Sequence, residues 1–87
     1  MIKIRFDGLV PDARHELFLV QEDIRATLKP DSVKVHAEQM GDGTIATTIC
    51  VRGSWVETNT GARMPETFIR DLERTAGITC SYDYAAD

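Results

Sequence analysis

The side chains of this sequence that could do chemistry are few. It contains two cysteines, Cys50 and Cys80, and two histidines, His15 and His36. A zinc site needs four clustered ligands, usually with close pairs along the chain, and neither cysteine has a second cysteine or a histidine at such a spacing. No glycine-rich phosphate loop is present either. The sequence therefore predicts no metal site and no cofactor.

Two further arrangements of residues could in principle act as catalytic groups. His36 and Glu38 fall on one face of an alternating segment, as an acid–base pair would. This spacing is common on any strand, and His15 is expected in solvent in a first helical turn. Cys50 would act as a nucleophile only beside a base or a cation, with a group to hold the developing charge, and no such set is identifiable. We assign no catalytic residue, and the sequence favours a non-enzymatic protein over an enzyme.

Cationic side chains form the first candidate binding surface. They alternate with apolar residues in segments that we interpret as strands, so they should share one exposed sheet face. A net charge of −4 for the 87 residues argues against binding to a phosphate backbone, and the central outward positions carry no aromatic residue on which a base could stack. Nucleic acid is therefore not expected as a partner. The candidate residues on this face are Lys3, Arg5, Lys34, His36 and Arg52.

Trp55 is the second candidate, because tryptophan is enriched at the centres of protein interfaces. It lies in a polar segment between two glycines, Gly53 and Gly61, where it serves equally well as an anchor on the edge of the core. Three arginines follow it, and nearby carboxylates allow an ordinary salt-bridged helix surface as the alternative. These residues are Arg63, Arg70 and Arg74.

The elements that position these side chains follow from hydrophobic periodicity. Alternation predicts four strands, at residues 2–7, 33–38, 44–52 and 78–84, with Trp55 and Val56 extending the third past a bulge at Gly53. Gly41 and Gly43 predict a tight hairpin between the middle two.

Helical spacing predicts two helices. One covers residues 12–28, where Phe18 and Leu19 widen the apolar stripe and Pro30 prevents continuation; the competing interpretation makes residues 15–20 a strand. The other begins near Pro65, and Gly77 is placed to cap its end.

The order strand–helix–strand–strand–helix–strand predicts an α+β, ferredoxin-like βαββαβ fold in a single domain, 1–87. Right-handed crossovers give a four-stranded antiparallel sheet of order 4-1-3-2 with both helices on one face. A β-grasp-like sheet with one main helix is the runner-up. In the first topology Cys50 lies on the open face and Cys80 faces the helices, so we expect both thiols to stay reduced.

The sequence therefore predicts a small acidic cytoplasmic protein with no signal peptide and no membrane segment. Our leading hypothesis is a protein–protein interaction module: an adaptor, a regulator or an inhibitor, of the kind that phages also encode. A homodimer through a sheet edge or the open sheet face is compatible with the pattern. The alternative is a small-molecule-sensing module or a small dimeric ferredoxin-like enzyme. A large cavity beside His36 or Cys50 would favour this alternative.

Overall fold

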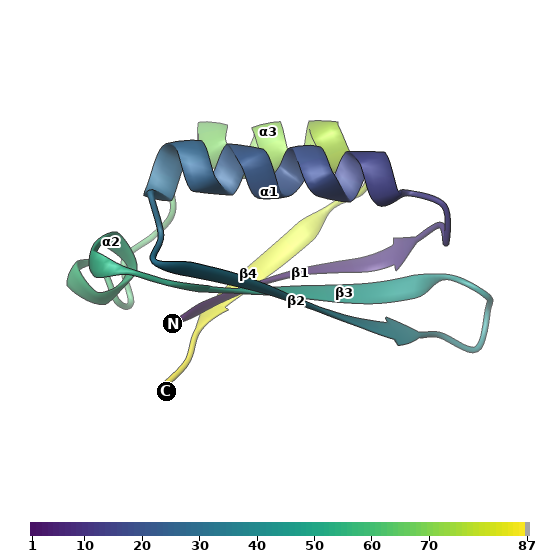
Figure 1. Cartoon of the computed structure of the whole chain (residues 1–87), viewed down its shortest axis with the longest axis horizontal. Helices are drawn as coiled ribbons and strands as arrows, with labels where there is room; N and C mark the ends of the chain where they lie inside the picture. Colours follow the sequence, from purple (N-terminus) through teal and green to yellow (C-terminus); the bar gives the residue numbers. More distant parts are fainter. Residues whose placement is uncertain (87) are drawn as a thin grey trace.

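Four antiparallel strands form one sheet in the order β2-β3-β1-β4, with two long helices between them in sequence. The computed structural model of the chain describes residues 1–86 (Figure 1). The predicted ferredoxin-like α+β topology is confirmed, and the β-grasp alternative is wrong. The elements are β1 (Ile2–Leu9), α1 (Arg14–Leu28), β2 (Ser32–Gln39), β3 (Ile45–Arg52), α2 (Ser54–Thr58), α3 (Glu66–Ala76) and β4 (Cys80–Tyr84).

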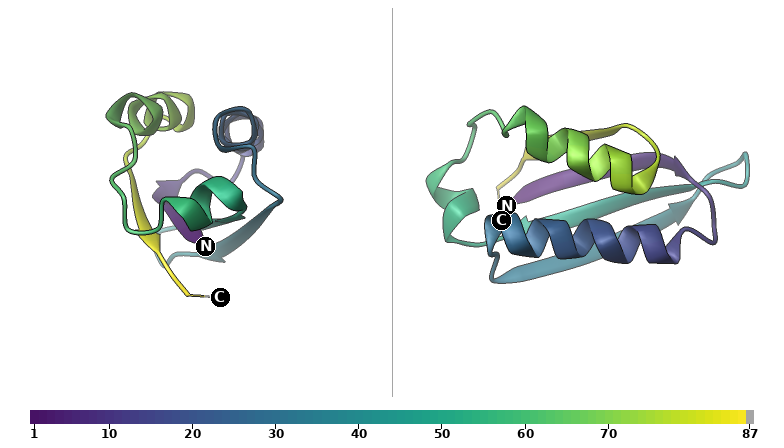
Figure 2. Two further views of the ribbon diagram at one scale, coloured as in Figure 1. Left: turned by 90° about the vertical axis from the view of Figure 1, so that its left-hand side faces the viewer. Right: turned by 90° about the horizontal axis from the view of Figure 1, so that it is seen from above.

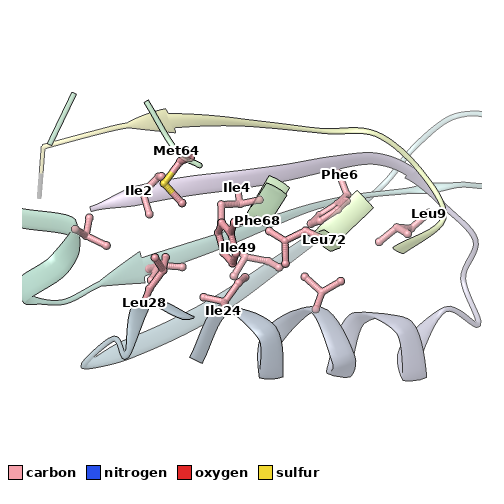
Figure 3. Packing of buried hydrophobic residues seen from close by; sticks show 13 residues of the cluster. Ile2, Ile4, Phe6, Leu9, Ile24, Leu28, Ile49, Met64, Phe68 and Leu72 are labelled. Atoms are coloured by element: carbon pink, nitrogen blue, oxygen red, sulfur yellow. The ribbon is translucent and has the colours of Figure 1, made fainter. Parts of the chain in front are cut away.

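The hydrophobic core lies between the sheet and one layer of helices. Figure 2 shows α1 and α3 side by side on one face, while the other face carries no element. Ile2, Ile4 and Phe6 are fully buried and point to the helices, which supply Ile24 and Leu72 among others (Figure 3). Alternation along β1 leaves the intervening side chains exposed on the open face, as the period of two requires.

The end of β1 differs from its prediction. Gly8 does not end the strand: it has a φ of 94° and forms a bulge, after which buried Leu9 pairs with Ile45. Glycine adopts this positive φ without steric cost. A turn closed by the Ala13 N–H donating to the Val10 carbonyl (3.1 Å) follows, so α1 begins at Arg14 rather than residue 12.

The outer flanks of α1 also differ. Residues 15–20 are helical, so the strand interpretation is wrong. Phe18 and Leu19 do not widen the buried stripe, because their side chains are 56% and 39% exposed. The core takes Val20, Ile24 and Leu28 from a narrower stripe.

The segment after β3 is a helix, not an extension of the strand. Ser54–Thr58 form the short helix α2, so Trp55 and Val56 do not continue β3 past a bulge. The change of direction brings the backbone of Gly53 close to the connection between α1 and β2. A Cβ at position 53 would lie only 3.0 Å from the Asp31 nitrogen and the Pro30 Cα, so a larger residue would collide there. The backbones of the two connections therefore approach each other at a residue that has no side chain.

Candidate functional site

The open face of the sheet carries its charges in rows that cross the strands. The register places residues of three or four strands opposite one another, which gives three rows across the face. The row nearest the middle of the face is cationic or neutral, and the row at the β2–β3 hairpin end is acidic. From one end to the other, the rows are Lys34–Cys50–Lys3–Asp83, His36–Thr48–Arg5–Ser81 and Glu38–Ala46–Asp7.

A shallow hollow of about 490 Å³ lies over the cationic end of this face. Cys50 and Thr48 belong to β3 and lie between the charged side chains of the neighbouring strands. A second hollow, of about 250 Å³, adjoins it and includes Arg5. The first hollow is lined by Met1, Lys3, Lys34, His36, Thr48, Cys50 and Arg52. We call these seven residues the cationic hollow.

The structure thus brings together four of the five residues predicted on this face: Lys3, Lys34, His36 and Arg52. The fifth, Arg5, lies one row away, and its Nε donates to the Asp7 carboxylate at 2.9 Å. The Asp7 carboxylate therefore partly neutralises the charge of Arg5.

The two cysteines have different surroundings, as predicted. Cys50 lies in the cationic hollow, while Cys80 is on the helix side of β4 and packs against the core; both thiols are free. Burial, and secondarily the charge of Glu73, raise the pKa of Cys80 to about 11. Its thiol therefore stays protonated at neutral pH, which makes it a poor nucleophile.

His36 and Glu38 share the open face, but no hydrogen bond joins their side chains within residues 1–86. Within the same range no group of three or more His, Cys, Asp or Glu side chains is placed to hold a metal ion. In the described part of the chain, no helix has the length and apolar character needed to cross a membrane.

The other four candidate residues lie away from the open face. Trp55 of α2 is half-buried and packs against the core cluster. Arg63 lines a separate hollow with Glu66 and Ile69, at the start of α3. The two arginines of α3 pair within their own helix: Arg70 with Glu66 at 2.7 Å, and Arg74 with Asp71 at 3.2 Å.

Sequence reasoning missed an apolar groove on the helix side of the sheet, where α1 begins and β2 ends. Part of it, about 240 Å³, lies between Leu17, Val10 and Ala37. An adjoining part of about 340 Å³ extends over Pro11, Ile45 and the hairpin. Ala37 was the available signal, because so small a side chain in an apolar strand position leaves space beneath the helix. We call the residues shared by both parts, Pro11, Ala37 and Ile45, the β2 groove.

Comparison with known proteins adds no relative: no family model, no curated protein and no solved structure matches this chain.

Proposed function

We propose that this chain is a non-enzymatic protein–protein interaction module, an adaptor, regulator or inhibitor of the cytoplasm, that binds an acidic segment of another protein on its open sheet face. The observation that carries the proposal is the cationic hollow. It gathers Lys3, Lys34 and Arg52 on one side of a chain whose net charge is −4.

The form of the site supports a macromolecular partner. All lining residues come from one sheet layer and the adjacent terminus, so no element covers the hollow on its solvent side. A small ligand is normally enclosed over most of its surface, whereas an extended chain or a protein surface can lie across a flat face. Clustered lysine and arginine side chains guide acidic partners to such a face and fix their orientation.

Protein is favoured over nucleic acid by the residues around the hollow. Recognition of single-stranded nucleic acid uses aromatic side chains on which bases stack. The register puts Tyr82 and Tyr84 of β4 on the same side as Ile4 and Ile2, facing the helices. The open face thus offers charge and hydrogen-bonding groups without a stacking platform.

The test is photo-cross-linking from a probe at Thr48, at the centre of the open face, in lysate of the source cells. The partner protein that the cross-link identifies is then purified separately, and its affinity for the chain is measured. Reversing two charges of the hollow, Lys3→Glu with Arg52→Glu, should weaken that affinity about tenfold or more. The matched control, Arg70→Glu with Arg74→Glu, changes the net charge equally on α3 and should leave the affinity within about threefold. Equal losses in both double variants, or cross-links to nucleic acid alone, would contradict the proposal.

A second candidate, a module that senses a small anion, is favoured by one observation: the hollow lies beside His36 and Cys50, and its volume is within the usual range for small-molecule sites. Inorganic phosphate serves as the probe. A rise in melting temperature with phosphate that disappears in the Lys3→Glu, Arg52→Glu variant would favour this function. No rise in the wild type would leave the protein-binding proposal as the better one.

A further inference from the structure

The β2 edge of the sheet has an open row of backbone groups. At the hairpin, the Met40 N–H donates to the Thr44 carbonyl at 2.8 Å, so these two residues form a hydrogen-bonded pair. Such pairs alternate along an antiparallel ladder. The even-numbered residues of β2 therefore bond to β3, and the odd-numbered ones direct their N–H and C=O groups outward. Within residues 1–86 no hydrogen bond to those outward groups is found; they belong to Val33, Val35, Ala37 and Gln39.

The open-face side chains of β2 are complementary to a copy of themselves. They read Lys34, His36, Glu38, with cation and carboxylate at equal distances on either side of the histidine. If two such strands pair antiparallel around a two-fold axis at His36, Lys34 lies opposite Glu38 of the second copy, twice. Opposite charges in directly facing cross-strand positions stabilise a pair. The same axis brings the acidic row of each open face beside the cationic row of the other.

The helix-side residues of β2 fit the same register. Val35 then lies opposite Ala37 of the second copy, and Val33 opposite Gln39. The two valines are half-buried, while Ala37 is exposed and borders the β2 groove. Each groove, with Pro11 and Ile45 as its other shared walls, thus receives the apolar side chains that the second copy brings.

The flank of α1 on this side also carries one large exposed apolar side chain, that of Phe18. Asp23 contacts Thr75 of α3, and Phe18 is five residues away, or about 140° around the helix. Phe18 therefore lies on the flank turned away from α3 and is 56% exposed. Figure 2 shows that α1 lies on the β2 side of the helix layer. Contact between the two α1 helices across the axis would cover it.

From these four features we propose that the chain forms a homodimer in which β2 pairs antiparallel with β2 of a second copy around a two-fold axis at His36. The two sheets become one, the helices of both copies lie on the same side, and the two cationic hollows share one open face. The outward backbone groups of the odd-numbered residues form hydrogen-bonded pairs, and His36 faces His36 of the second copy in a non-hydrogen-bonded pair. This inference does not depend on the proposed function.

The first test is a charge swap followed by analytical ultracentrifugation. Lys34→Glu and Glu38→Lys each place like charges opposite one another at two sites and should weaken the dimer about tenfold or more, while the double variant restores both pairs and should return to within about threefold of the wild type. Arg70→Glu, on the exposed surface of α3, is the matched control for the charge change and should leave association unchanged. Melting curves establish that every variant is folded.

The second test fixes the register. In a Cys50→Ser, Cys80→Ala background, His36→Cys should form an intermolecular disulfide rapidly on mild oxidation, because facing non-hydrogen-bonded residues have the Cα separation that a disulfide needs. Lys34→Cys and Glu38→Cys are the controls, since neither faces its own copy, and both should cross-link slowly. A wild type that stays monomeric at millimolar concentration, a double charge swap that does not recover, or equal cross-linking at all three positions would overturn the proposal.

Discussion

The two edge strands of the sheet, β2 and β4, differ in length and in what covers their outward backbone groups. β2, at one edge, has eight residues and leaves its outward backbone groups without a bond in the described structure. β4, at the other, has five residues. The Ala85 N–H donates to the Met1 carbonyl, so these two residues form a hydrogen-bonded pair of the β1–β4 ladder. Because such pairs alternate, the even-numbered residues of β4 direct their backbone N–H and C=O groups away from β1. The first of them, Cys80, donates its N–H to the Glu73 carboxylate at 2.8 Å.

Proteins that remain monomeric shorten, cover or charge the edges of their sheets. Here the β4 edge is short and partly covered by a side chain of α3, while the β2 edge is long, alternates charges of opposite sign and borders an apolar groove. On the homodimer proposed above, the β2 edge is the one that associates, because its cation and carboxylate are complementary to those of a second copy rather than repelling it. The predictions below test this contrast, from the largest expected effect to the smallest.

Proline substitutions separate the inward from the outward residues of β2. His36→Pro removes an N–H that bonds to β3 and should lower the free energy of unfolding by about 3 kcal/mol. Ala37→Pro removes an N–H that points outward, where an edge strand tolerates proline, so the monomer should lose less than about 1 kcal/mol while the dimer is lost. Urea denaturation of both variants checks this. Equal destabilisation would mean that the assignment of inward and outward residues is wrong.

Trp55 lies at neither edge, and its contacts with the core indicate a stabilising role. Because the side chain is half-buried, Trp55→Ala should lower the free energy of unfolding by about 2 kcal/mol, less than the loss for a fully buried tryptophan. Affinity for a second copy should change little in the protein that remains folded. A variant with an unchanged melting temperature and lost binding would instead place Trp55 in an interface.

Burial is the larger cause of the raised pKa of Cys80, and the charge of Glu73, whose carboxylate covers the start of the β4 edge, is the smaller one. In a Cys50→Ser background, Glu73→Gln should move the pH midpoint of Cys80 alkylation below about 11 and cost about 1 kcal/mol through the weakened hydrogen bond. Since the folded-state pKa lies above the ordinary value of 9.0, stability that is present below pH 9 should fall as the pH rises towards 11. Glu57→Gln, at an exposed position of α2, is the control and should move neither quantity.

The smallest effect is expected at the arginines of α3. Arg70 and Arg74 form exposed pairs within their helix, so alanine at either position should change the free energy of unfolding by less than about 0.5 kcal/mol. Urea denaturation at low and high salt checks the value. A loss above about 1 kcal/mol would show that the helix surface contributes more than exposed ion pairs normally do.

The sequence was sufficient for the fold and the open face because strict alternation assigns side chains to faces. Lys3, Lys34, His36 and Arg52 come together because one face of four strands must avoid water while the other does not. Two features were not predictable from periodicity. Whether Phe18 is buried depends on how closely α1 approaches the β2 edge, and the helix at Trp55 depends on the close backbone contact that Gly53 permits.

The most direct test of the contrast between the edges is amide hydrogen exchange measured by NMR at increasing protein concentration. If β2 pairs with a second copy, the outward N–H groups of Val35 and Ala37 should become more protected as the concentration rises. The outward N–H groups of Tyr82 and Tyr84 on β4 should exchange at the same rate throughout. Concentration-independent exchange in β2, or protection that develops in β4 instead, would contradict the account.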